Sequence, residues 1–132
     1  MAKSRDLRVR SFQFTVDIVT FCGATLHRDP VLRRLLFQLV DAAGSVGANL
    51  EESGAGQSKP DFIAKQCIAL KEAHESRFWL RVIAASFPAV SQHTAPLTQE
   101  ASELIAMLTS SINTAKSNPN RGEPRPERNE EC

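Results

Sequence analysis

Hydrophobic residues recur with a helical period along four long segments of the chain, and turn-forming residues separate these segments. The second segment carries the stripe Leu32, Leu36, Leu39, Ala43, Val46 and Leu50. The third carries Phe62, Ala69, Ala73, Leu80, Ile83 and Phe87, and the fourth carries Leu97, Ala101, Leu104, Leu108, Ile112 and Ala115. Spacings of three and four residues put such side chains on one face of an α-helix. No segment alternates with the period of two that is typical of strands, so the pattern predicts helices alone.

The first segment differs because it carries two stripes. These consist of Phe14, Ile18 and Phe21 and of Phe12, Val16 and Val19. Apolar residues on two faces predict a helix that is buried on more than one side.

Capping residues mark the ends of these helices. Asp29 is an expected N-cap with Pro30 in the first turn, and Ser58 and Asp61 have the spacing of a weak capping box. Pro88 ends the third helix, because proline does not continue a helix. The helices are expected at about residues 5–26, 30–53, 59–87 and 95–117.

Four helices with short connections predict an all-α fold, an antiparallel up-down four-helix bundle formed by one domain over residues 1–117. Residues 118–132 contain three prolines and no apolar residue before the final cysteine, so a disordered tail is expected there. Folding the second and third helices back on each other puts Asp41 opposite Lys71 and Arg34 near Glu75, which predicts two ion pairs.

Composition excludes several classes of protein. The 16 Lys and Arg residues nearly balance the 15 Asp and Glu residues, and a net charge of +1 excludes a strongly basic nucleic-acid coat. No apolar run has the length of a membrane span, and the first ten residues lack the apolar core of a secretory signal. We expect a cytoplasmic protein that does not bind membranes.

The chain shows no pattern typical of a catalytic or metal site. Cys22, Cys67 and Cys132 lack the close spacing of zinc or redox motifs, and reduced thiols are expected. A di-metal bundle would need Glu-x-x-His on two helices, and this motif is absent. The sequence therefore predicts no enzyme, no metal and no cofactor.

Two glycines interrupt the second helix, where each costs about 1 kcal/mol relative to alanine. Gly44, Gly47 and Ala48 would give the helix a small-residue face that another helix can approach closely. The alternative is that the helix breaks into a loop here.

The third helix contains a cluster of aromatic and basic residues, Arg77, Phe78, Trp79 and Arg81. Phe78 and Trp79 flank the bundle stripe, so a second surface is needed to bury them. One interpretation is stacking on nucleic-acid bases. The other, which we favour, is a subunit interface, where Trp, Phe and Arg are enriched.

A second basic group lies at the N-terminus, where Lys3, Arg5, Arg8 and Arg10 are opposed by Asp6. Repeated around a ring of subunits, it would produce a positive field. The candidate nucleic-acid contacts are Arg5, Arg8, Arg10, Lys59 and Lys65. The alternative is an ordinary solvated terminus.

Residues 44–83 closely resemble the 23S rRNA intervening-sequence proteins, also called four-helix-bundle proteins. The matching motifs are S-V-G-A-N at residues 45–49, S-K-x-D-F at residues 58–62, and I-A-L-K-E-A-x-E-S-x-x-W-L at residues 68–80. The resemblance implies an antiparallel bundle assembled into a homopentameric ring, similar to the accessory protein of diversity-generating retroelements. It implies no enzymatic activity.

The retroelement relatives engage nucleic acid and a reverse transcriptase, and they are strongly basic, whereas this chain is nearly neutral. We therefore expect a non-enzymatic homo-oligomeric scaffold that binds itself and a protein partner. The alternative is an accessory protein that binds RNA or DNA through the N-terminal basic residues.

Overall fold

The computed structural model describes residues 2–25, 29–55, 58–118 and 132, with side chains described from residue 6 onward. Four helices account for nearly all of these residues: α1 (Ala2–Ala24), α2 (Pro30–Ser53), α3 (Lys59–Ser86) and α4 (Ser91–Ser117). A short 3-10 helix, η1 (Pro88–Val90), joins α3 to α4. The described residues contain no strand, which confirms the predicted all-α class.

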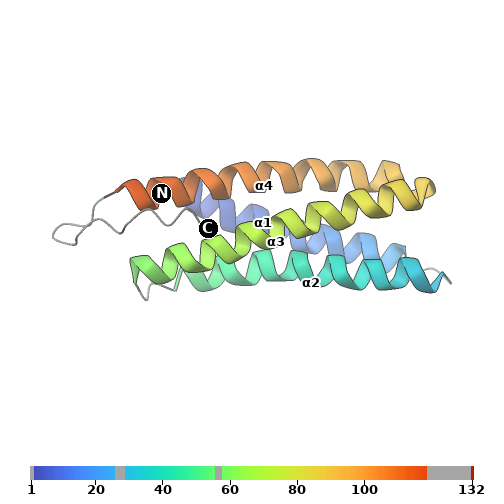
Figure 1. The fold of residues 1–132 in the computed structure, drawn as a ribbon, viewed down its shortest axis with the longest axis horizontal. Coiled ribbons are helices and arrows are strands. Elements are labelled where there is room, and N and C mark those ends of the chain that lie inside the picture. Colours follow the sequence, from blue (N-terminus) through green and yellow to red (C-terminus); the bar gives the residue numbers. More distant parts are fainter. Residues whose placement is uncertain (1, 26–28, 56–57, 119–131) are drawn as a thin grey trace.

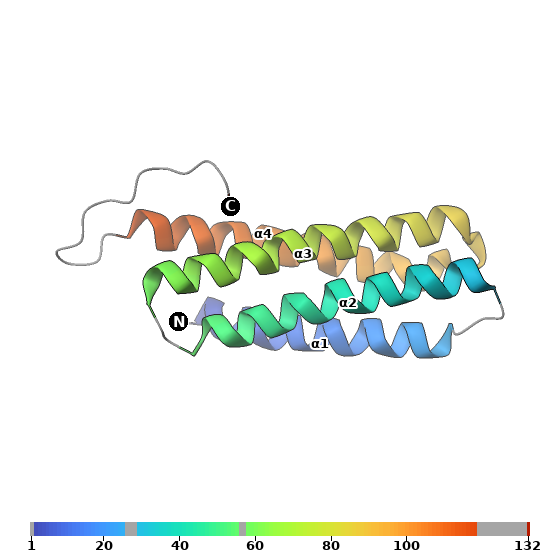
Figure 2. The ribbon, with the colours of Figure 1, turned by 60° about the horizontal axis from the view of Figure 1, so that its bottom comes forward.

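Successive helices lie side by side and run in opposite directions (Figures 1 and 2). Each of α1 and α3 packs against both α2 and α4, so the four helices surround one core. Most residues of the predicted stripes form this core: Leu39, Val46, Leu80, Ile83, Leu104 and Leu108 are all fully buried. The stripe residues Phe62, Phe87 and Ala115 are only half-buried.

The predicted caps explain where α2 and α3 begin. The Asp29 carboxylate accepts hydrogen bonds from the backbone N–H groups of Val31 at 2.8 Å and Leu32 at 3.1 Å. The Ser58 hydroxyl accepts one from the backbone N–H of Asp61 at 3.2 Å. These contacts satisfy N–H groups that have no partner within the helix.

Some helix bounds differ from the expected ones. The first helix begins at Ala2 and ends at Ala24, and residue 26, its expected end, lies outside the described residues. The fourth begins at Ser91 and contains Pro96 inside its second turn. Thr94, one residue before the expected start, is buried and donates its hydroxyl to the Ser91 carbonyl at 2.9 Å, so this turn is packed onto the bundle. Residues 119–131 of the expected tail also lie outside the described part.

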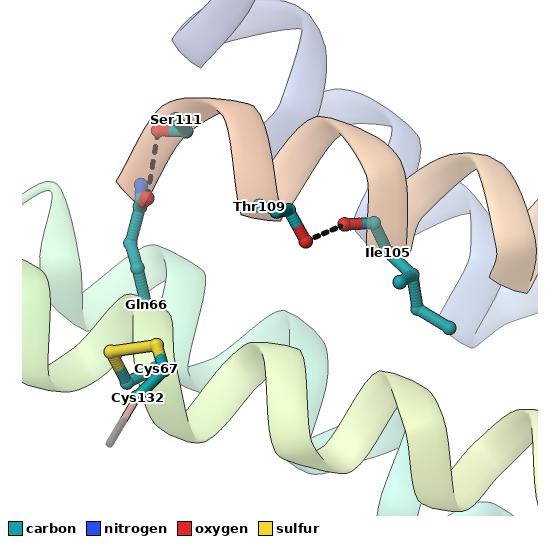
Figure 3. The surroundings of a disulfide bond; sticks show 6 residues. All are labelled: Gln66, Cys67, Ile105, Thr109, Ser111 and Cys132. Atoms are coloured by element: carbon teal, nitrogen blue, oxygen red, sulfur yellow. Dashed lines mark hydrogen bonds between the residues drawn. A yellow bond between two sulfur atoms is a disulfide. The ribbon is translucent and has the colours of Figure 1, made fainter. Parts of the chain in front are cut away.

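The expectation of three reduced thiols is wrong. A disulfide joins Cys67 of α3 to Cys132, with their Cα atoms 5.1 Å apart (Figure 3). Cys22 is free and buried. The partners are 65 positions apart. Such a pairing depends on the path of the chain in space, which spacing along the sequence does not reveal.

Candidate interaction surface

The outer side of α1 presents a row of apolar side chains to solvent. Val9 is 62% exposed, Phe12 64%, Val16 39% and Val19 50%. These residues are three or four positions apart, so they form one stripe about 15 Å long at 1.5 Å per residue. We call these four residues the α1 stripe.

The opposite face of α1 lies in the core. Leu7, Phe14 and Ile18 are each at most 2% exposed. The two apolar stripes therefore lie on separate faces of α1, as predicted, but only one of them is buried in the single chain. The prediction that α1 is buried on more than one side is wrong for the isolated chain, because α1 contacts α2 and α4 on its inner side only.

Arg10 fixes α1 against α4. Its Nε and one terminal nitrogen donate to the two carboxylate oxygens of Glu100, each at 2.9 Å, and the same nitrogen lies 3.2 Å from Glu103. The hydrogen bond to Glu100 raises the pKa of Arg10 above its ordinary value, and the charges of Glu100 and Glu103 act in the same direction. This pairing orients α1 so that the α1 stripe faces outward.

The small residues of α2 fall on two different sides of the helix. Gly47 faces α1: a Cβ atom there would lie 3.0 Å from the Thr15 hydroxyl oxygen, which itself donates to the Ala43 carbonyl at 3.0 Å. Ala48 is exposed, and apart from the adjoining part of α2 itself, no described atom lies within 4 Å of a Cβ built on Gly44. Gly47 thus serves packing within the chain, whereas Gly44 and Ala48 leave a shallow outer face.

That outer face of α2 also carries an exposed aromatic residue. Phe37 is 59% exposed, and it lies seven positions before Gly44, or two helical turns away on the same side. Phe37, Gly44 and Ala48 together are called the α2 outer face below.

The aromatic residues singled out on α3 have different environments. Phe78 is 53% exposed, while Trp79 is partly buried against the core, and their rings meet edge to face with centroids 5.0 Å apart. The Trp79 indole Nε1 is buried without a hydrogen-bond partner among the described residues. Arg77 donates to the Ser102 hydroxyl of α4 at 3.3 Å, and Arg81 is exposed.

Most of the candidate nucleic-acid contacts already have partners within the chain. Lys65 lies 2.9 Å from Glu52 of α2, and the Lys59 ammonium donates to the Asn118 carbonyl. Arg10 is paired as described, and Arg8 is exposed. The side chain of Arg5 lies outside the described part.

The ion pairing between α2 and α3 also differs from the one expected. The ion pair between these helices joins Glu52 to Lys65, and neither Asp41–Lys71 nor Arg34–Glu75 is formed between these described side chains. Both predicted pairs are wrong, because the apolar stripes decide which helix faces meet but not which charged side chains on their edges come together.

Two titratable residues of α3 have shifted pKa values. Burial lowers the pKa of His74, and the Arg77 charge lowers it further. Burial raises the pKa of Glu72, with a further contribution from the charge of Glu75. Among the described residues, no group of three His, Cys, Asp or Glu side chains is placed to hold a metal ion.

The α1 stripe is the feature that interpretation of the sequence missed as a surface. Its signal was present in the second apolar row of the first helix. A bundle helix needs one buried face, so in a helix with two apolar faces the second face is left exposed.

None of the described helices is both long and apolar enough to cross a bilayer.

Comparison with known proteins matches the chain to a family and to solved structures. The family described as 23S rRNA-intervening sequence protein matches residues 5–110. A crystal structure from Bacteroides thetaiotaomicron, described as a protein with unknown function from the S23 ribosomal protein family, is 28% identical with a TM-score of 0.76. The match covers 85% of this chain and 99% of that one. No curated protein matches the chain.

Proposed function

Because this chain belongs to the 23S rRNA-intervening sequence protein family, we propose that it is a non-enzymatic, homo-oligomeric four-helix bundle that acts as an interaction scaffold. The observation that carries this proposal is the exposed α1 stripe.

The α1 stripe favours a protein contact over exposure to water. Burying one large apolar side chain is worth about 1.5 to 3 kcal/mol, and contiguous apolar patches on soluble proteins mark interaction sites. Phe12 and its three neighbours are aligned on a rigid helix, so they can be buried together by one partner surface. A second copy of the chain is the partner that is always present at equal concentration.

The proposed partner surface for the α1 stripe is the α2 outer face of a neighbouring copy, which has the exposed Asp41 at its edge. Gly44 and Ala48 leave room for large side chains, and Phe37 extends the apolar surface. A contact between two different faces is heterologous, and repeated heterologous contacts form a ring when the rotation between neighbouring copies closes. Five copies is the number we propose, as the family resemblance implies.

The aromatic cluster of α3 remains a second proposed contact. Phe78 is exposed enough to lose solvent on assembly, and Arg77 and Arg81 flank it. Trp79 has less to contribute because much of its ring already packs against the core of its own chain.

The experiment that tests assembly is light scattering after size-exclusion chromatography. The parent protein is expected at a multiple of 14.5 kDa, and Phe12→Glu is expected at the monomer mass because a buried carboxylate would oppose assembly. Gln92→Glu adds the same charge at an exposed position of α4 and should leave the assembly intact. A parent protein that is monomeric at micromolar concentration would overturn the proposal.

Binding of RNA or DNA is the alternative function. The ion pairs of Arg10 and Lys65 argue against it, because these cations are already paired with carboxylates of the same chain. Phosphate contacts release counterions, so six of them would give a slope of about −5 for log affinity against log salt. Titration of structured RNA at two salt concentrations separates the functions. Tight, salt-dependent binding that is lost when Arg5, Arg8 and Arg10 are changed to alanine would replace the scaffold proposal by the nucleic-acid one.

A further inference from the structure

The disulfide between Cys67 and Cys132 lies on the outside of the bundle. Cys132 is exposed, and Cys67 is half-buried on α3. The preceding residue of α3, Gln66, is buried and accepts a hydrogen bond from the Ser111 hydroxyl of α4 at 2.7 Å (Figure 3). The disulfide therefore joins an exposed residue to a half-buried position of α3, where a dissolved thiol can reach it.

We propose that Cys67 and Cys132 form a thiol–disulfide exchange site, whose co-substrates are thiol reductants and their disulfides. Through it, a thiol detaches the C-terminal residue from α3, and the oxidised form of that thiol attaches it again. This proposal does not depend on assembly of the bundle.

The exchange is a two-electron reaction in two steps. The thiolate of the reductant attacks the exposed Cys132 Sγ, the bond between the two protein sulfurs breaks, and Cys67 leaves as a thiolate that takes up a proton. A second reductant thiolate attacks the reductant sulfur of this mixed disulfide and releases Cys132, which is protonated in turn. Two reductant thiols thus become one disulfide, and one protein disulfide becomes two thiols.

The third cysteine does not compete for this exchange. Cys22 is 7% exposed, and its thiol points toward the Leu36 carbonyl at 3.7 Å. Burial also raises the pKa of Cys22 to about 11, so the reactive thiolate is scarce at neutral pH. The site therefore has two states, with no alternative pairing inside the folded chain.

Reduction changes how the C-terminal part of the chain is held. In the oxidised state, the covalent link closes a loop of α3, η1 and α4 that spans 65 positions. In the reduced state this link is absent. The start of α3 and the end of α4 are then held together by noncovalent contacts, such as the hydrogen bond from the Lys59 ammonium to the Asn118 carbonyl. The oxidised state is expected to melt at a higher temperature, because the link restricts the unfolded chain.

The test is a tryptic digest without reductant of full-length protein equilibrated with oxidised glutathione and quenched at low pH. Cleavage after lysine and arginine gives peptide 66–71 and peptide 129–132, and we expect to recover them as one linked pair that separates with dithiothreitol. Cys22→Ser should retain the pair and the melting shift, and Cys132→Ser should lose both. With limiting reduced glutathione, the mixed disulfide should form on Cys132 at least tenfold more than on Cys67.

Three results would overturn the proposal. One is recovery of the two peptides unlinked, each carrying glutathione, from the oxidised protein. Another is a link from either peptide to residues 11–28, which contain Cys22. The third is a melting temperature that reduction leaves unchanged in the parent protein.

Discussion

At the residue scale, a few side chains fix how α1 sits on the bundle. Arg10 ties it to α4 through both oxygens of Glu100, and Gly47 lets it approach α2 until the Thr15 hydroxyl reaches the Ala43 carbonyl. The α1 stripe points outward because these two contacts occupy the other sides of the helix.

Gly47→Leu is expected to destabilise the fold by about 1 to 3 kcal/mol, because the added side chain would meet Thr15 at once and force α1 and α2 apart. Denaturant unfolding in the Phe12→Glu background measures this without a contribution from assembly. Gly44→Leu is the matched control, since an added side chain there meets no described atom within 4 Å of its Cβ. Equal stability of the two variants would show that α1 does not pack closely on Gly47.

Cys22 gives the fold a pH dependence at alkaline pH. Its pKa is raised from 9.0 to about 11 by burial, so folding favours the protonated thiol. The resulting stability is complete below pH 9 and decreases as the pH rises toward the folded value, by up to about 3 kcal/mol at 1.36 kcal/mol per pKa unit. The free energy of unfolding should therefore decrease more between pH 8 and pH 11 in the parent protein than in Cys22→Ala. Parallel decreases in both proteins would contradict burial of this thiol.

At the element scale, each helix could be predicted where its ends carry a specific chemical signal. Asp29 and Ser58 set the starts of α2 and α3. The start of α4 could not be predicted in this way, because Pro96 suggested a first turn but lies inside the helix. Its N-cap residue, Val90, makes no side-chain capping hydrogen bond, so packing of Thr94 against the bundle decides this end.

Pro96→Ala is expected to stabilise α4 by about 1 to 3 kcal/mol. Proline has no N–H group to donate to the carbonyl four positions earlier, and alanine restores this donor and raises helix propensity. Position 96 is exposed, so the change removes no core packing. Thermal melting measures the effect, and an unchanged or lower melting temperature would indicate that the proline shapes the connection through η1.

At the scale of the whole molecule, the sequence predicts the bundle well and its surfaces poorly. The stripes of α2, α3 and α4 identify the core because each of these helices has one dominant apolar face. In α1 two apolar faces compete, and only the arrangement of the neighbouring helices decides that Phe14 is buried and Phe12 is exposed. The link between Cys67 and Cys132 and the ion pair between Glu52 and Lys65 likewise depend on the path and register of the chain.

The whole molecule is also nearly neutral, so net charge repulsion between copies does not oppose assembly, and in the proposed assembly apolar contacts supply most of the stability. The net charge is +1, and Arg10 and Lys65 are neutralised by carboxylates of the same chain. Contacts of apolar side chains are not weakened by salt, whereas ion pairs are. Assembly through the α1 stripe should therefore persist at high ionic strength.

Sedimentation equilibrium of the parent protein at low and high salt tests the central claim most directly. We expect a particle of several copies, five in the proposed ring, with a mass that is a multiple of 14.5 kDa and does not decrease at 1 M salt. A mass of 14.5 kDa at micromolar concentration in both buffers would contradict a scaffold built through the α1 stripe.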